Sequence, residues 1–292
     1  MALLFAFFSY TIWSTGDAMV KLATEESVTP LEVMFFCGSL NALFTVLRAW
    51  KLNLLPELIP ISKKLVFLRT LFGVLIGFFF YTSYSMIPLA NSYVVEFTSP
   101  LIVSIGAALF LSERLSRIKL LIILLGFAGA YIAINPAEIL SGNISAKGYA
   151  AVLAGTICFS ASQLLLRKLS QSEKPEAMIF WAASATVAFS LFMTGGNINL
   201  PSPKAALFLL FASTCGLSGW FLMIRAFKNA TATSIATLQY WQLVPGAIFG
   251  YLIWHTTPGW NIFIGSGIII ASGLAMAHQT HKQANVLALL EK

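Results

Sequence analysis

PLEVMFF at residues 30–36 and PEAMIFW at residues 175–181 are two versions of one segment, and their repetition decides the fold. Each version starts with a proline and carries a glutamate, Glu32 or Glu176, at the beginning of an apolar run. The fixed φ of proline and a carboxylate near the positive end of the helix dipole both favour a helix N-terminus. The pair therefore predicts that one helix-forming unit occurs twice in the chain.

Other residue pairs extend this internal repeat. The matches are Asp17 with Gln163, Lys21 with Arg167, Pro100 with Pro245, Gly126 with Gly267 and Gly129 with Gly273. Chance similarity between apolar helices is the alternative explanation. A duplication predicts two repeats, at residues 1–136 and 147–279, followed by a short cytoplasmic tail at 280–292.

The composition is typical of a membrane protein. Of the 292 residues, 58% are hydrophobic and only 10% are charged, and the mean hydropathy is +0.82. Soluble domains carry roughly 25% charged residues, and a transmembrane helix needs about 20 mostly apolar residues. The apolar runs predict an all-α integral membrane protein with ten transmembrane helices, at residues 2–21, 30–49, 65–86, 91–111, 117–135, 148–166, 176–194, 205–225, 232–254 and 260–279.

The positive charges predict the orientation of these helices. With the N-terminus in the cytoplasm, the cytoplasmic loops and their flanks, Arg69 included, hold all but three of the 18 Lys and Arg residues. Such a bias marks the cytoplasmic side of a membrane protein. Both termini are therefore expected in the cytoplasm, which requires an even number of helices.

Five helices in each repeat imply that the second repeat enters the membrane from the opposite side to the first. Inverted repeats are common in secondary transporters, where the substrate site lies near the middle of the membrane between the repeats. The fold therefore predicts transport by alternating access, in which the two five-helix halves rock against each other.

Four longer stretches carry a resemblance to a known family. They are STGDAMVK at 14–21, SYSMIPLANSYVVEFTSPLIV at 83–103, LSERLS at 111–116 and IRAFKNATATSIATLQYWQLVPG at 224–246. With these motifs the chain resembles the EamA group of ten-helix proteins in the drug/metabolite transporter superfamily. The last stretch is also similar to the branch that contains S-adenosylmethionine carriers of intracellular bacteria.

This resemblance implies a secondary active transporter in a bacterial inner membrane that moves a small organic metabolite. The narrower similarity implies uptake or exchange of S-adenosylmethionine. Export of amino acids or other metabolites is the alternative, and a passive channel or a non-transporting membrane scaffold is the alternative of another class.

Two acidic residues inside predicted spans, Asp17 and Glu96, are candidates for the substrate site. An ionisable side chain in a span costs roughly 2.5–3.5 kcal/mol on insertion scales, so each one suggests a function. Asp17 lies one helical turn from Lys21, and an ion pair between them or a hydrogen bond to a neighbouring helix is the structural alternative. Glu96 has no basic residue within a turn. It is therefore the candidate for exchanging a proton or neutralising a cationic substrate, and a neutral, hydrogen-bonded carboxyl is its alternative.

Amide and aromatic side chains complete the predicted substrate site. Gln239 and Gln242 share one face of the helix at 232–254 and offer both donors and acceptors, as does Gln163 in the helix at 148–166. Polar contacts between helices are the alternative role for these amides. Trp13 and Tyr93 offer aromatic faces for a planar or cationic ligand, with simple packing as their alternative.

Several other functions are not expected. An enzyme would need a nucleophile–base pair or a metal cluster at membrane depth, and neither is visible. The three cysteines and three histidines have no metal-ligand spacing, so no metal or cofactor is expected. The basic residues form no patch suited to nucleic acid. Because the chain has no Walker A motif, a coupling proton or a counter-substrate is expected to drive transport.

Overall fold

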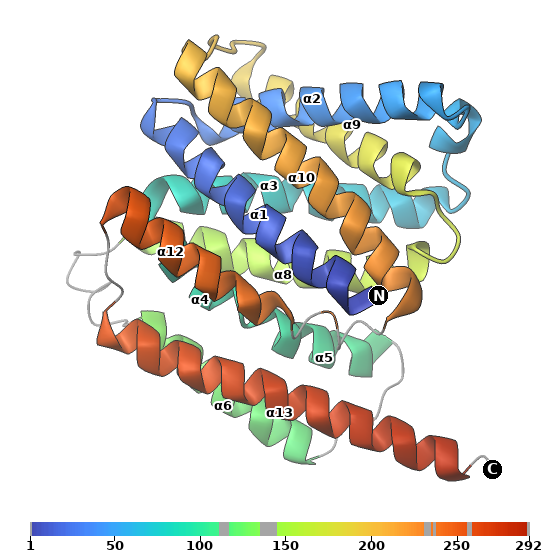
Figure 1. Ribbon diagram of the computed structural model, residues 1–292, viewed down its shortest axis with the longest axis vertical. Coiled ribbons are helices and arrows are strands. Elements are labelled where there is room, and N and C mark those ends of the chain that lie inside the picture. Colours follow the sequence, from blue (N-terminus) through green and yellow to red (C-terminus); the bar gives the residue numbers. More distant parts are fainter. Residues whose placement is uncertain are drawn as a thin grey trace.

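All regular secondary structure is helical in the residues that the computed structural model describes, 2–110, 117–134, 145–230, 235, 238–255 and 259–290 (Figure 1). The α-helices are α1 (Ala2–Glu25), α2 (Pro30–Lys51), α3 (Lys63–Met86), α4 (Leu89–Glu96), α5 (Ser99–Phe110), α6 (Arg117–Ile134), α8 (Ala146–Leu169), α9 (Pro175–Thr194), α10 (Pro203–Asn229), α12 (Leu243–Trp254) and α13 (Trp260–Leu290). Two short 3-10 helices are η1 (Leu55–Leu58) and η2 (Leu238–Gln242). The predicted all-α fold class is confirmed.

Among the described helices, five are long and apolar enough to cross a membrane: α2, α3, α8, α9 and α10. Shorter apolar stretches occur in α6, α12 and α13, at Leu120–Ile132, Val244–Trp254 and Trp260–Ala275. The LSERLS motif at 111–116 lies outside the described residues.

The predicted helix at 91–111 is interrupted, because α4 ends at Glu96 and α5 begins after a turn at Phe97 and Thr98. Pro100, in the first turn of α5, explains the break. Proline has no N–H, so a continuous helix would leave the carbonyl of Glu96, four residues earlier, without its usual partner. Hydrophobicity alone does not detect this break.

The predicted helices at 232–254 and 260–279 also differ from the structure. In the first, the described residues from Leu238 onward form the 3-10 helix η2 and then α12, and Pro245 lies close to the start of α12. The second continues as α13 to Leu290, so the predicted end at 279 is wrong.

The two glutamates of the repeated segment start helices, as predicted, and each also contacts the other side of the antiparallel pair α2–α9, Glu176 within a helix and Glu32 in the loop after α9. Glu32 forms a capping box with Thr29 at the start of α2, and its Oε1 accepts a 2.8 Å hydrogen bond from Nδ2 of Asn199, beyond the end of α9. Glu176 starts α9 and accepts a 3.1 Å hydrogen bond from Nε of Arg48, in the last turn of α2. Both ends of the α2–α9 pair are therefore joined by a buried carboxylate.

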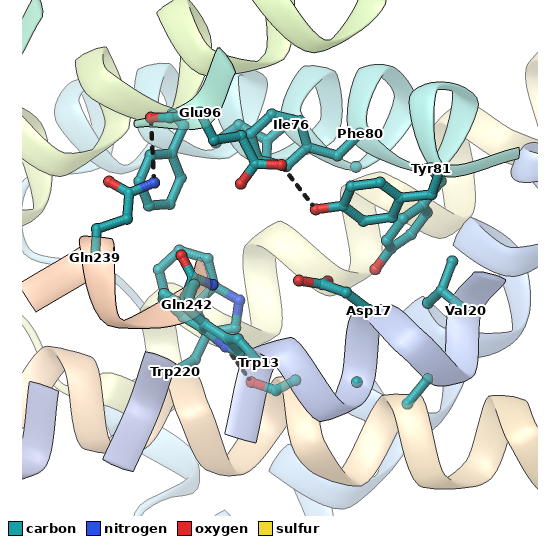
Figure 2. A pocket seen from close by; sticks show the side chains of 16 residues that line it. Trp13, Asp17, Val20, Ile76, Phe80, Tyr81, Glu96, Trp220, Gln239 and Gln242 are labelled. Carbon is teal, nitrogen blue, oxygen red and sulfur yellow. Dashed lines mark hydrogen bonds between the residues drawn. The ribbon is translucent and has the colours of Figure 1, made fainter. Parts of the chain in front are cut away.

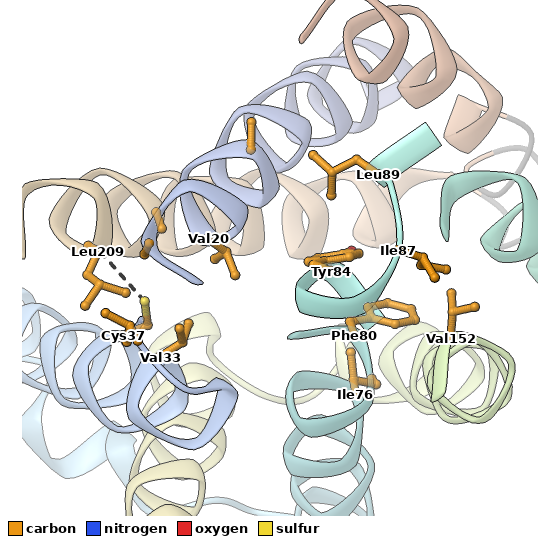
Figure 3. Packing of buried hydrophobic residues seen from close by; sticks show 14 of the residues in the cluster. Val20, Val33, Cys37, Ile76, Phe80, Tyr84, Ile87, Leu89, Val152 and Leu209 are labelled. Atoms are coloured by element: carbon orange, nitrogen blue, oxygen red, sulfur yellow. Dashed lines mark hydrogen bonds between the residues drawn. The ribbon is translucent and has the colours of Figure 1, made fainter. Parts of the chain in front are cut away.

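A buried apolar cluster joins α1, α2, α3, α4, α8 and α10. In Figure 3, Val20 of α1 lies near Tyr84 and Leu89, where the end of α3 leads into α4. Between α2 and α10, Sγ of Cys37 donates to the carbonyl of Leu209 at 3.7 Å. Close packing of this kind holds membrane helices together, because lipid tails are as apolar as the side chains.

Helices that are distant in the sequence lie side by side. α2 packs on α9 at one edge of the molecule in Figure 1, and α6 packs on α13 at the opposite edge. Between these edges, α1 packs mainly on α10 and η2, whereas α3 packs mainly on α8, which also contacts α4 and α5. We call the first group the α1–α10 bundle (α1, α10 and η2) and the second the α3–α8 bundle (α3, α4, α5 and α8).

Small residues let α1 and α10 approach closely. Oγ of Ser9 donates a 2.8 Å hydrogen bond to the carbonyl of Gly219, and the indole of Trp13 fills the space that a side chain at Gly219 would need. One turn earlier, a Cβ at Gly216 would meet only Nδ2 of Asn41, at an ordinary 3.9 Å.

The substitution Gly219→Ala is therefore expected to destabilise the protein. The new methyl group collides with Trp13, and overpacking of this kind costs about 1–3 kcal/mol. Thermal unfolding of the detergent-solubilised protein measures the effect, and Gly216→Ala is the matched control, expected to unfold at the wild-type temperature or above it. Equal melting temperatures for the two variants would contradict the close approach of α1 and α10.

Candidate functional site

A cavity of about 120 Å³ lies between the α1–α10 bundle and the α3–α8 bundle. Five of the seven residues predicted for the site line it, namely Trp13, Asp17, Glu96, Gln239 and Gln242. In Figure 2 the carboxyl groups of Asp17 and Glu96 point toward the same space. The other two predicted residues, Tyr93 and Gln163, are buried but are not part of its lining.

Glu96 reaches the cavity because α4 ends there. The residue is only 4% exposed, and its Oε1 accepts a 3.1 Å hydrogen bond from the hydroxyl of Tyr84 on α3. Its backbone carbonyl, which Pro100 cannot pair, accepts a 3.4 Å hydrogen bond from Nε2 of Gln239. No ion pair involves Glu96 among the described residues.

Asp17 is held by a tyrosine. The hydroxyl of Tyr93 donates a 2.9 Å hydrogen bond to Oδ2 of Asp17. Tyr93 is fully buried, and its ring occupies the space beside Gly246 of α12, where a Cβ would come within 2.5 Å of it. Tyr93 therefore positions Asp17 from behind the cavity wall instead of lining the cavity itself.

Of the two structural alternatives for Asp17, the hydrogen bond to a neighbouring helix is present, from Tyr93 of α4, whereas the described residues show no ion pair with Lys21. Nζ of Lys21 donates instead to the carbonyl oxygens of Tyr84 and Ile87, at 3.0 and 3.1 Å. These carbonyls lie at the C-terminal end of α3, where helical hydrogen bonding stops and the helix dipole attracts a cation. Among the described residues, the carboxylate of Asp17 therefore has no basic partner.

The amides at the cavity differ in how well their hydrogen bonds are satisfied. Oε1 of Gln239 is buried without a partner among the described residues, although Nε2 is bonded to Glu96. A buried unpaired acceptor is costly, and a donor from a bound molecule would satisfy it. Gln242 also lines the cavity, whereas Gln163 on α8 is buried away from it.

Aromatic rings form much of the remaining wall. Trp13 and Trp220 meet edge to face with their ring centroids 4.8 Å apart, and Phe80, Tyr81 and Phe159 line the cavity as well. Such faces stack on planar groups and attract cations. With two carboxyl groups that lack basic partners, the cavity suits a cationic or proton-donating ligand that has a planar part.

A second cavity, of about 140 Å³, shares the residues Ile76, Gly77, Tyr81 and Trp220 with the first. Its lining includes Arg69, which is 4% exposed. The guanidinium lies 4.9 Å from the ring centroid of Trp220, and Nη1 donates a 3.3 Å hydrogen bond to the carbonyl of Met178.

The charge count places Arg69 at the flank of a cytoplasmic loop, but its side chain is buried at a cavity, and the prediction missed it as a candidate site residue. Arg69 lies inside the predicted helix at 65–86, just over a turn from its start, and an ionisable residue inside a span was the signal that could have found it.

Nothing in the described part of the chain resembles a metal centre. No group of three or more His, Cys, Asp or Glu residues there could hold a metal ion, and Cys37, Cys158 and Cys215 are all free thiols. The residues that line the two cavities offer charge, hydrogen bonds and aromatic faces.

Comparison with known proteins agrees with a transport function. The EamA-like transporter family model matches residues 1–135 and 146–277. A pseudopaline exporter of Pseudomonas aeruginosa is 24% identical over 269 residues, which cover 91% of this chain and 92% of that protein. An S-adenosylmethionine uptake transporter of Rickettsia bellii is 28% identical over 239 residues, which cover 78% of this chain and 80% of that protein.

A solved crystal structure has the same fold. It superposes with a TM-score of 0.68 at 16% sequence identity and covers 97% of this chain and 98% of the other. The resemblance inferred from the four sequence motifs is thus confirmed. This chain belongs to the EamA-like transporter family of the drug/metabolite transporter superfamily, and it is a membrane transporter.

Proposed function

We propose that the protein is a secondary active transporter that moves a small organic metabolite by alternating access. The observation that carries the proposal is the pair of carboxyl groups, Asp17 and Glu96, which face one cavity between two helix bundles without basic partners among the described residues. Buried carboxyls of this kind in a membrane protein serve proton relays or bind cationic ligands.

Two inverted repeats, at residues 1–136 and 147–279, are part of this proposal. The directions of their helices support the inversion. α1 and α3 run the same way, since Lys21 near the end of α1 contacts the end of α3. α8 runs the opposite way, since Gly148 near its start lies beside Ile87, which follows α3. The two parts matched by the family model agree closely with these boundaries.

The packing of the helices supports the same repeats. Exchanging the two repeats maps the α1–α10 contact onto the α3–α8 contact, and it maps α2–α9 and α6–α13 onto themselves. In Figure 1 the N-terminal end of α1 and the C-terminal end of α13 lie on the same side, in keeping with an even number of spans and two cytoplasmic termini in an inner membrane.

The moving units in this proposal are the two bundles and not the two five-helix halves expected from the sequence. The α1–α10 bundle and the α3–α8 bundle each contain helices from both repeats. The cavity lies between the bundles, so a rocking motion of one against the other would open it to one side at a time.

Two basic residues bridge these bundles at opposite ends. Lys21 of α1 donates to the last carbonyls of α3, as described above. Its repeat partner Arg167, in the last turn of α8, donates a 2.7 Å hydrogen bond from Nη1 to the carbonyl of Phe227 near the end of α10. Because α1 and α8 run in opposite directions, one bridge closes each side of the cavity.

For the substrate, we propose a metabolite with a cationic group and a planar part. S-adenosylmethionine fits this description, since its sulfonium would meet Asp17 or Glu96 and its adenine would stack on Trp13 or Trp220. A relative that exports pseudopaline supports the alternative direction, export of a metabolite. A proton carried on Glu96 or an exchanged counter-substrate would supply the energy.

Flux measurements on reconstituted proteoliposomes test the proposal. A carrier is expected to saturate and to be stimulated by its own substrate on the opposite side, whereas a channel does neither and a scaffold gives no flux. The substitution Glu96→Gln is expected to lower cation-selective or proton-coupled flux at least about ten-fold, because it removes a charged hydrogen-bonding group worth about 1.5–3 kcal/mol.

The control for this variant is Glu57→Gln. Glu57 lies on η1, and its half-exposed carboxylate is paired with Lys174. Its flux is expected to equal that of the wild type. Unchanged flux and an unchanged pH profile in Glu96→Gln, at normal expression, would remove Glu96 from the mechanism.

The substitution Gln242→Ala tests the amide side of the cavity. Loss of one hydrogen bond to the substrate is expected to raise KM about two- to ten-fold. Gln163→Ala is the matched control, since Gln163 is buried away from this cavity. A wild-type KM in Gln242→Ala would assign η2 to helix packing alone.

The two bridges make opposite predictions for access to the cavities. Lys21→Met is expected to speed labelling of Cys37, in the second cavity, from the side where α3 ends, and Arg167→Met from the other side. Because each substitution removes a charged hydrogen bond, the labelling rate from that side is expected to rise about ten-fold over the wild-type rate. A membrane-impermeant thiol reagent on oriented vesicles, with Cys158 and Cys215 replaced by serine, gives the rates.

Lys147→Met, which changes an exposed lysine at the start of α8, is the control for the loss of charge. Identical labelling from both sides in Lys21→Met and Arg167→Met would contradict the assignment of one bridge to each face.

A further inference from the structure

We propose that Arg69 binds a carboxylate of the transported molecule in the second cavity. The substrate would then be a zwitterion, with its anionic group at Arg69 and its cationic group at Asp17 and Glu96 in the first cavity. This inference rests on the proposed transport function and adds a second, oppositely charged part to its site.

The charge of Arg69 is not balanced within the described structure. The residue is 4% exposed, and the ion pairs of the described residues involve Arg48, Lys174 and Lys204 but not Arg69. Its Nε is buried with no hydrogen-bond partner in the part of the chain that the structure describes. A buried, unpaired charge is strongly unfavourable, so a cation retained here indicates an anion that binds part of the time.

The surroundings hold the guanidinium in place but leave part of its donor set unused. Met178 accepts a hydrogen bond from Nη1 alone, and Trp220 lies against the guanidinium at 4.9 Å. Neither is an anion, so neither neutralises the charge. The planar fork of an arginine matches the two oxygens of a carboxylate.

The other polar groups of the second cavity favour a single negative charge. Asn41 and Ser162 line the cavity and are neutral. Oδ1 of Asn41 already accepts a 2.7 Å hydrogen bond from Oγ of Ser213, so the NH2 group is what Asn41 can offer to a ligand. One cation and neutral donors suit a carboxylate better than the doubly charged phosphate of a nucleotide or sugar phosphate.

The two cavities are adjacent, and the proposal requires one molecule to span both. Their linings have Ile76, Gly77, Tyr81 and Trp220 in common. An acidic region and a basic region therefore lie on either side of these shared residues, of which Tyr81 and Trp220 are aromatic. A compound with an ammonium or sulfonium group at one end and a carboxylate at the other matches this polarity.

Matched pairs of compounds test the assignment on the full-length protein in proteoliposomes. The pairs are S-adenosylmethionine with its decarboxylated form, methionine with methioninamide, and arginine with agmatine, and a sugar phosphate represents the phosphate class. For the pair that the wild type transports, the member without the carboxylate is expected to compete for flux at least about 30-fold more weakly than the member that has it. This is the size of effect expected when one partner of a buried charge pair is removed.

Substitutions at Arg69 locate the source of this discrimination. In Arg69→Gln the two members of the pair are expected to compete equally well for flux, and in Arg69→Lys part of the difference between them is expected to remain. In Arg225→Gln, which changes an exposed arginine on α10, the whole difference is expected to remain. The ligand-free Arg69→Gln protein is expected to melt no lower than the wild type, because an unpaired buried charge has been removed.

The outcomes separate this inference from the function on which it rests. The role of Arg69 is overturned, and the transport function is not, if transport is saturable but equal for compounds with and without the carboxylate, or if it prefers the sugar phosphate. The same holds if Arg69→Gln still discriminates fully between the two members of the pair. Flux that never saturates and is never trans-stimulated, with any member of the panel, overturns both.

Discussion

The structure depends on one missing amide hydrogen, that of Pro100. In a membrane every backbone polar group must find a partner within the protein, and Pro100 leaves the carbonyl of Glu96 without one inside its own helix. Helix α4 therefore stops at Glu96, and its last carbonyl accepts a hydrogen bond from the side chain of Gln239 on the 3-10 helix η2. This contact joins the two bundles across the cavity and brings a carboxyl and an amide to its wall.

Much of the fold can be predicted from the sequence, because a segment that crosses lipid must be a long apolar helix. The apolar runs and the Pro-Glu helix starts at Glu32 and Glu176 depend on local chemistry, and the helices begin where that chemistry predicts. Asp17 and Glu96 could be selected as unusual inside apolar runs, and the structure brings them to one cavity.

What could not be predicted depends on packing between distant segments. Arg69 looks like a topological marker in the sequence, and only the approach of α9 and α10 shows that it is buried. Lys21 donates to the carbonyls at the end of α3 and not to Asp17, because the end of α3 lies within reach of its ammonium group. Tyr93 likewise was expected to meet substrate, but contact with Gly246 directs it to Asp17 instead.

The pairing of the helices has a consequence for the origin of the protein. The pairs α1–α10, α3–α8, α2–α9 and α6–α13 each join a helix before residue 135 to one after residue 145. Half of the chain alone would thus leave these helix faces without their partners, with neither bundle complete. With the inverted repeats proposed above, an ancestor of half this length would have formed the same cavity by associating with a second copy inserted in the opposite direction, and the fusion of two such genes would have made that association permanent.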